Sequence, residues 1–187
     1  MVDKKKVREG VKLMLEGMGE DPKREGLKDT PERVARMYEE LLFGMEEEAA
    51  DHLSRTFTVE EEDMVLEKNI AFASICEHHL MPFFGKAHIA YIPDGKVVGL
   101  SKLARTVEVF GRRLQMQERM TGQIADAIMD ELDCAGVMVM LEAEHTCMTM
   151  RGVKKPGATM VTTQLLGRFK TDEKTRAEFM SRIYAPR

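Results

Sequence analysis

Residues 70–92, IAFASICEHHLMPFFGKAHIAYI, hold two apolar stretches separated by a short polar segment. The first stretch, Ile70–Ile75, is a compact apolar run, and the second, Lys86–Ile92, ends at the turn signal Pro93-Asp94-Gly95. Apolar runs of this length between turn-forming residues are typical of strands. We therefore expect a pair of neighbouring strands, with the polar residues 76–79 in the turn that follows the first strand.

Patterns typical of helices and of further strands surround this pair. Apolar residues at intervals of three and four predict helices, and capping residues and prolines mark where helices begin. The expected helices are 7–19, 30–42 (with a cap offered at Asp29-Thr30 before Pro31), 101–114 (capped by Ser101), one that begins at 115–119 and carries its apolar residues through 132, and 172–182. The further strands are 137–143, 146–151 and 159–166. This order predicts an α+β fold with a mainly antiparallel sheet. The length of 187 residues fits one domain, or one domain plus an arm.

Composition excludes several classes of partner. The chain has 28 basic and 32 acidic residues and a formal net charge of -4, so it has no overall attraction for nucleic acid or an anionic membrane. Its first six residues, MVDKKK, are charged where a secretory signal needs an apolar run, and no apolar stretch approaches a membrane span. We expect a cytoplasmic protein that binds neither nucleic acid nor membrane.

Two short segments collect most of the metal-binding side chains. Cys76 and the adjacent pair His78 and His79 lie in the expected turn, and His145 and Cys147 lie far away in the sequence. A thiol and an imidazole three residues apart can bind one ion, and sulfur with imidazole favours zinc over magnesium or calcium. The sequence therefore predicts a zinc site, and its spacing alone does not choose between the two adjacent histidines.

Several alternatives remain open at this point. The cysteines and histidines could be ordinary core residues, or four of them could form a closed structural site. With three protein ligands the fourth position would hold an acidic water suited to hydrolysis. If 146–151 is a regular strand, Cys147 and Arg151 share a face with His145, whereas Met148 and Met150 face the core. Cys134 has no histidine near it in the sequence, and we interpret it as a buried thiol.

Two helix starts carry side chains suited to a nucleotide. Ser101, Lys102 and Arg105 open one helix, where free backbone N–H groups also favour anions, although an ordinary solvated helix start would look the same. Glu118 opens another helix, and a carboxylate can accept two hydrogen bonds from guanine, although acids are common there. The chain lacks the P-loop and dinucleotide glycine motifs and the zinc deaminase signature.

The order of these motifs resembles that of GTP cyclohydrolase I. Cys-Glu-His-His, Gly-Leu-Ser-Lys-Leu-Ala-Arg, Gln-Glu-Arg and His-x-Cys followed by Arg-Gly occur in this order, and the similarity spans about residues 26 to 182. The resemblance implies a tunnelling fold with two central helices on the sheet, an N-terminal helical arm of residues 1–60 and a catalytic domain of residues 61–187. It also implies a toroidal homodecamer with active sites shared between subunits.

The resemblance assigns a reaction and its residues. Zinc-dependent hydrolysis would convert GTP and water into 7,8-dihydroneopterin triphosphate and formate, the first step of pterin and folate biosynthesis. His145 would protonate the purine near N7, and His78 and Ser101 would assist opening of the ribose. The implied zinc ligands are Cys76, His79 and Cys147. The implied GTP-binding residues are Glu118, Gln117 and the Met116 backbone at the base, and Lys102, Arg105, Arg151 and also Arg33 at the triphosphate.

Two rival functions have different chemistry. A zinc-stabilised binding module would use His78 or His145 as a fourth ligand and would have no turnover. A nitrile reductase of the same fold would use a cysteine nucleophile and a nicotinamide cofactor. The two paired zinc segments argue against this second function.

Overall fold

A five-stranded sheet forms the centre of the computed structural model, which describes residues 1–185. The strands lie in the order β5-β2-β3-β6-β7. Their bounds are β2 (Val65–Cys76), β3 (Pro82–Ile92), β5 (Leu114–Gln115), β6 (Gly136–His145) and β7 (Met160–Gly167). All neighbours are antiparallel except β5, which runs parallel to the end of β2. The prediction of an α+β fold with a mainly antiparallel sheet is confirmed.

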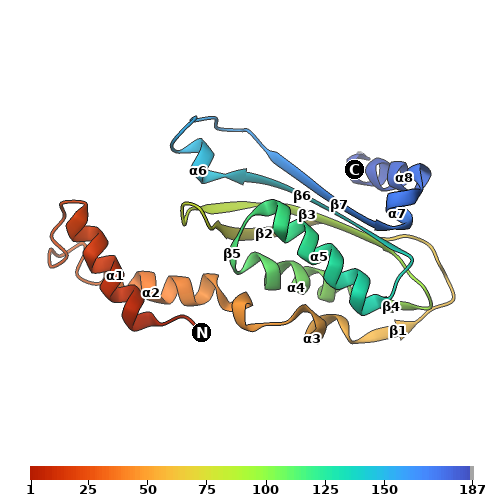
Figure 1. Ribbon diagram of the computed structural model, residues 1–187, viewed down its shortest axis with the longest axis horizontal. Coiled ribbons are helices and arrows are strands. Elements are labelled where there is room, and N and C mark those ends of the chain that lie inside the picture. Colours follow the sequence, from red (N-terminus) through yellow and green to blue (C-terminus); the bar gives the residue numbers. More distant parts are fainter. Residues whose placement is uncertain (186–187) are drawn as a thin grey trace.

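Helices cover both faces of this sheet (Figure 1). Helices α4 (Leu100–Gly111) and α5 (Gln117–Leu132) pack on one face, where Ile89 and Tyr91 are fully buried. Helices α7 (Arg168–Thr171) and α8 (Glu173–Tyr184) cover the other face, against Ala90 and Ile92. Neighbouring residues of β3 alternate between the two cores because side chains of a strand point to opposite faces. The expected pair of central helices is therefore present.

The N-terminal residues form a helical arm beside one end of the sheet (Figure 1). Helices α1 (Lys4–Gly17) and α2 (Thr30–Leu41) pack on each other, and η1 (Phe43–Glu46) and α3 (Ala49–Leu53) lead to the sheet. Leu53 is fully buried in the core formed with α4 and α5. The division at residue 60 stays a prediction, and the last two residues of the 61–187 domain lie outside the described part.

A small two-stranded sheet, which the sequence patterns do not predict, anchors the start of α4. Strand β1 (Thr56–Thr58) pairs with β4 (Lys96–Val98). The backbone N–H of Val98 donates to the hydroxyl of Tyr91 at 3.1 Å. This bond ties the residues just before α4 to the far end of β3. None of the helices in residues 1–185 is long and apolar enough to cross a bilayer.

The structure corrects two expectations about the segment that follows His145. Residues 146–151 are not a strand: β6 ends at His145, and the helical turn α6 (Thr146–Thr149) follows. The partner strand β3 starts at Pro82, so β6 has no further neighbour on that side, and the Thr146 hydroxyl donates to the Pro82 carbonyl. Met150 is consequently 71% exposed and does not face the core.

Two expected helix caps also differ. Gly99 occupies the cap position of α4, which makes Ser101 part of its first turn, and Asp29 makes no capping hydrogen bond at α2.

Candidate active site

The turn between β2 and β3 carries the first two candidate metal ligands. Backbone bonds from Leu80 N–H to the Cys76 carbonyl and from Cys76 N–H to the Met81 carbonyl, both 2.9 Å, close this turn. His79 lies inside it, with Nδ1 3.9 Å from the Cys76 sulfur. Cys147 comes from α6, directly after β6 ends. Within residues 1–185, the ligand atoms of Cys76, His79 and Cys147 form a group in which all lie within 4.8 Å of one another.

This group fits a zinc ion. Zinc–sulfur bonds of about 2.3 Å and zinc–nitrogen bonds of about 2.0 Å place tetrahedral ligand atoms about 3.5–3.8 Å apart. The distance between the Cys76 sulfur and His79 Nδ1 is close to this range. Burial and the neighbouring Cys76 thiol raise the pKa of Cys147. A bound dication would oppose that effect, because it favours the thiolate form.

Two further histidines border the metal group. His78 Nδ1 lies 4.0 Å from the Cys76 sulfur, and its ring stands edge-on to that of His79. His145 stacks on the buried Phe83 ring, with centroids 4.5 Å apart and an interplanar angle of 6°. Burial lowers the pKa of His145, and the carboxylate of Glu118 acts in the opposite direction. The structure thus brings both candidate proton-transfer histidines to the metal group.

A cavity of about 200 Å³ lies between the metal group and the start of α5. It is lined by Cys76, His78, His79, Gln115, Met116, Gln117, Glu118, His145, Cys147 and Met160. Glu118 is exposed at the first turn of α5, whereas Gln117 is 1% exposed. Complete pockets for drug-sized ligands measure about 300–1,000 Å³. This cavity can therefore take a nucleobase, but a whole nucleoside triphosphate must extend beyond it.

Arg151 is the one candidate phosphate ligand that reaches the metal group within the chain. Its Nη1 lies 2.9 Å from His79 Nε2. Arg33 is exposed on α2, and its guanidinium lies 3.6 Å from the carboxylate of Asp29.

Ser101, Lys102 and Arg105 lie at the opposite end of the sheet from the metal group. The start of α4 is fixed near Tyr91, whereas Phe83 pairs with His145 beside the metal group. Phe83 and Tyr91 are eight positions apart in β3, which corresponds to about 26 Å. Helix α4 starts next to β4 and runs toward β5, which lies beside the Cys76 end of β2 (Figure 1). The first turn of α4 is therefore the part of this helix most distant from the metal group. One chain alone therefore does not assemble all the predicted substrate residues.

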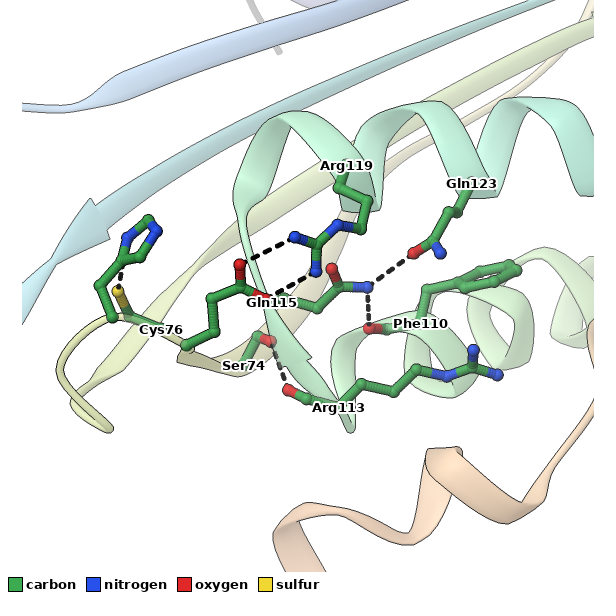
Figure 2. Close-up of polar contacts among 9 residues, drawn as sticks. Ser74, Cys76, Phe110, Arg113, Gln115, Arg119 and Gln123 are labelled. Atoms are coloured by element: carbon green, nitrogen blue, oxygen red, sulfur yellow. Dashed lines mark hydrogen bonds and ion pairs between the residues drawn. The ribbon is translucent and has the colours of Figure 1, made fainter.

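Glu77 and Arg119 belong to two of the sequence motifs, and nothing in the sequence indicates a role for either residue. Arg119 donates two hydrogen bonds to the Glu77 carboxylate, at 2.6 and 2.8 Å, and holds the pKa of that carboxyl below its usual value. The Glu77 N–H also donates to the Gln115 carbonyl. Figure 2 shows Arg119 beside Gln115, whose amide donates to the Phe110 carbonyl and to Gln123. These contacts fasten the metal-binding turn to α5.

Comparisons with known proteins identify the family of this chain. The family model for GTP cyclohydrolase I matches residues 7–184. A GTP cyclohydrolase 1 of Carboxydothermus hydrogenoformans is 61% identical over 184 residues, covering 98% of this chain and 96% of that protein. One of Clostridium perfringens is 60% identical over 183 residues, covering 98% and 99%. A solved structure, the archaeosine synthase QueF-Like in the apo form, matches with a TM-score of 0.49 and 15% identity over 58% of this chain and 97% of its own. The chain belongs to the GTP cyclohydrolase I family.

Proposed function

We propose that the protein hydrolyses GTP to 7,8-dihydroneopterin triphosphate and formate. One water is consumed, and the carbon lost from the five-membered ring of the purine leaves as formate. The observation that carries this proposal is the single cavity that Cys76, His79 and Cys147 share with His145 and Glu118. This cavity can take one nucleobase, and it brings together a metal group, a proton-transfer group and a carboxylate that can bind guanine.

The chain's own residues have separate tasks in this proposal. Glu118 accepts hydrogen bonds from N1–H and the exocyclic amine of guanine, which orients the base in the cavity. His145 supplies a proton near N7 of the purine, and His78 serves the opening of the ribose. The Met116 backbone contacts the base beside Glu118. Zinc, when bound by two cysteines and one histidine, supplies Lewis-acid activation of a water.

We propose further that a second copy of the chain completes each site. Ser101, Lys102 and Arg105 from one subunit would join the metal group of its neighbour, because one chain holds these two sets at opposite ends of its sheet. Exposed apolar residues support such a contact: Leu80 beside the metal group is 49% exposed, and Leu100 beside Ser101 is 70% exposed. A toroidal decamer is the assembly that the family resemblance implies.

Arg151 would meet the triphosphate from the metal side, with Arg33 as a further candidate from the arm. The apolar cavity of about 600 Å³ between α1, α2 and the metal-binding turn adds another surface that a neighbouring subunit could cover. All three cysteines of the chain are free thiols, which suits the reducing cytoplasm.

Turnover of GTP tests the reaction directly. Zinc-loaded protein is incubated with GTP, and formate and a pterin that becomes fluorescent after oxidation are measured. We expect both products in equal amounts. A zinc protein that produces neither would be a binding module and would refute the proposal.

Two substitutions separate metal binding from proton transfer. We expect Cys147→Ser to lose zinc and turnover together, because it removes one of three ligands. His145→Ala should retain zinc and lose turnover by about 10²–10⁴-fold, the usual contribution of a general acid. Equal loss of zinc in both variants would show that the ligand assignment is wrong.

Mixing two inactive variants tests the shared site. His145→Ala damages the metal half of a site, and Lys102→Ala damages the phosphate half. After the two proteins are dissociated together and reassembled, about one quarter of randomly formed interfaces would combine two intact halves. Activity well above that of either variant alone supports sharing. No recovery in mixed oligomers would mean that each chain builds its own site.

A further inference from the structure

The side chain of Gln117 is fully engaged inside the protein. Its Nε2 lies 3.1 Å from the carbonyl oxygens of Leu141 and Met160 and from the hydroxyl oxygen of Thr162. Its Oε1 lies 2.8 Å from Nε2 of His145. Only the NH₂ group of the amide can donate to carbonyl oxygens, so rotating the amide by 180° would place Oε1 against two acceptors. The position of the amide oxygen is therefore fixed by its surroundings.

This arrangement determines which nitrogen of His145 carries a proton. An amide oxygen only accepts hydrogen bonds, so the ring nitrogen that faces it must donate. Phe83 stacks on the ring and holds its plane. Hydrogen bonding by the partner of one ring nitrogen generally sets the state of the other. In neutral His145 the proton therefore sits on Nε2, and Nδ1 has the lone pair.

We propose that Gln117 is a positioning residue for His145 that dedicates Nδ1 to proton exchange with the substrate. Within residues 1–185, Nδ1 has no hydrogen-bond partner, and His145 lines the cavity. The ring donates from its doubly protonated form, in which both nitrogens carry a proton. In the transfer step the Nδ1–H bond of this imidazolium breaks, an N–H bond forms on the purine, and the electron pair stays on Nδ1, which leaves the neutral ring. Nε2–H remains bonded to Gln117 throughout. The Gln117 side chain thus serves His145 in place of the base-binding role that the family resemblance implies for it, and leaves contact with the base to Glu118.

The inference rests on the proposed function, because it concerns the proton that His145 gives to the substrate. Its first test needs no turnover. Nitrogen-15 NMR of zinc-loaded protein with labelled histidines identifies which ring nitrogen is protonated, and the His145 signals are assigned by their loss in His145→Ala. We expect the protonated nitrogen of the neutral ring to be Nε2, the one bonded to Cδ2. Protonation at Nδ1 instead would overturn the inference even in an active enzyme.

Kinetics of Gln117 variants form the second test. Gln117→Met has a similar length but no acceptor, and we expect it to lower kcat about 10–100-fold, as loss of an orienting partner commonly does. KM should change by less than about threefold, because no substrate contact is lost. A buried Gln117→Glu can be neutral, donate to one carbonyl and still accept from His145. We expect it to recover kcat to within about fivefold of the wild-type value.

The same substitution in a His145→Ala background distinguishes positioning from substrate binding. With the imidazole absent, Gln117→Met should lower kcat by no more than about twofold further, because coupled residues are not additive. A rise in KM in both backgrounds would overturn the inference, since it would mean that Gln117 holds the base. Loss of zinc or of thermal stability without recovery in Gln117→Glu would also overturn it, in favour of a merely structural role. Wild-type protein without turnover would instead refute the proposed reaction and leave the NMR result standing.

Discussion

The buried His88 makes a specific prediction about stability at mildly acidic pH. His88 is 2% exposed on the face of β3 that α8 covers, and its Nδ1 accepts from the Asn69 N–H at 3.4 Å. Its Nε2 lies 3.7 Å from Glu142 and has no hydrogen-bond partner. Burial is the largest influence on the pKa of His88, and it lowers that pKa. The Glu142 carboxylate raises the pKa, and the nearby Lys86 and Lys68 lower it. The net shift is downward, so the folded protein favours the neutral ring.

The sign of the effect on stability follows from this shift, and its upper limit follows from the uptake of one proton. Above a pH of about 6.5, the usual pKa of histidine, His88 is neutral in both states and has no effect on stability. Below it the unfolded chain takes up a proton that the folded chain resists, so stability falls as the pH falls toward the lowered pKa. The limiting slope for one proton is about 1.4 kcal/mol per pH unit, so the loss of stability between pH 7 and pH 5.5 is at most about 1.3 kcal/mol, reached if the folded ring stays neutral throughout.

Urea denaturation of wild type and His88→Asn from pH 7 to pH 5.5 measures this effect. Asparagine keeps an acceptor for the Asn69 N–H but does not titrate, so its packing defect should shift the whole curve by a constant. The remaining histidines and the metal site are common to both proteins. We expect the wild type to lose more stability than the variant over this range, by up to about 1.3 kcal/mol. Parallel curves would refute the role assigned to His88.

Three further outcomes are expected. Arg119→Met removes both bonds to Glu77 and should weaken zinc binding about 10–100-fold in a chelator competition. The same change at Arg112, which follows α4 and pairs with Glu108 of that helix, should leave zinc binding near the wild-type value. Gly85→Ala would place a methyl group 1.8 Å from the Glu142 carbonyl oxygen, so calorimetry should show destabilisation of about 3 kcal/mol or more, and a melting temperature equal to that of the wild type would contradict this clash. Removing the metal with a chelator should abolish turnover, and zinc should restore it; full activity of metal-free protein would disprove the metal dependence.

Features that depend on local chemistry could be predicted from the sequence. The apolar run Ile70–Ile75 lies in β2, and the helical pattern 120–132 lies in α5, because periodicity reports which face is buried. The donor types in the metal group follow directly from the identities of Cys76 and Cys147. The choice of His79 over His78 did not follow from spacing, because both lie in one short turn.

Contacts between distant segments were decided by the tertiary structure. The predicted strand 146–151 failed because the length of β6 depends on where its neighbour β3 begins, which is a property of the pairing and not of the segment. Glu77 and Arg119 are 42 positions apart, and no local pattern indicates that they pair.

The sequence by itself determined the class of fold, the zinc-type ligands and the order of motifs that identifies the family. Tertiary structure decided which of those residues meet. It gathered Cys76, His79 and Cys147 around one point and directed Gln117 to His145. It also left Lys102 at the other end of the sheet. The physical reason is that residue identity fixes what a side chain can bind, whereas strand pairing and helix packing fix which atoms come within bonding distance.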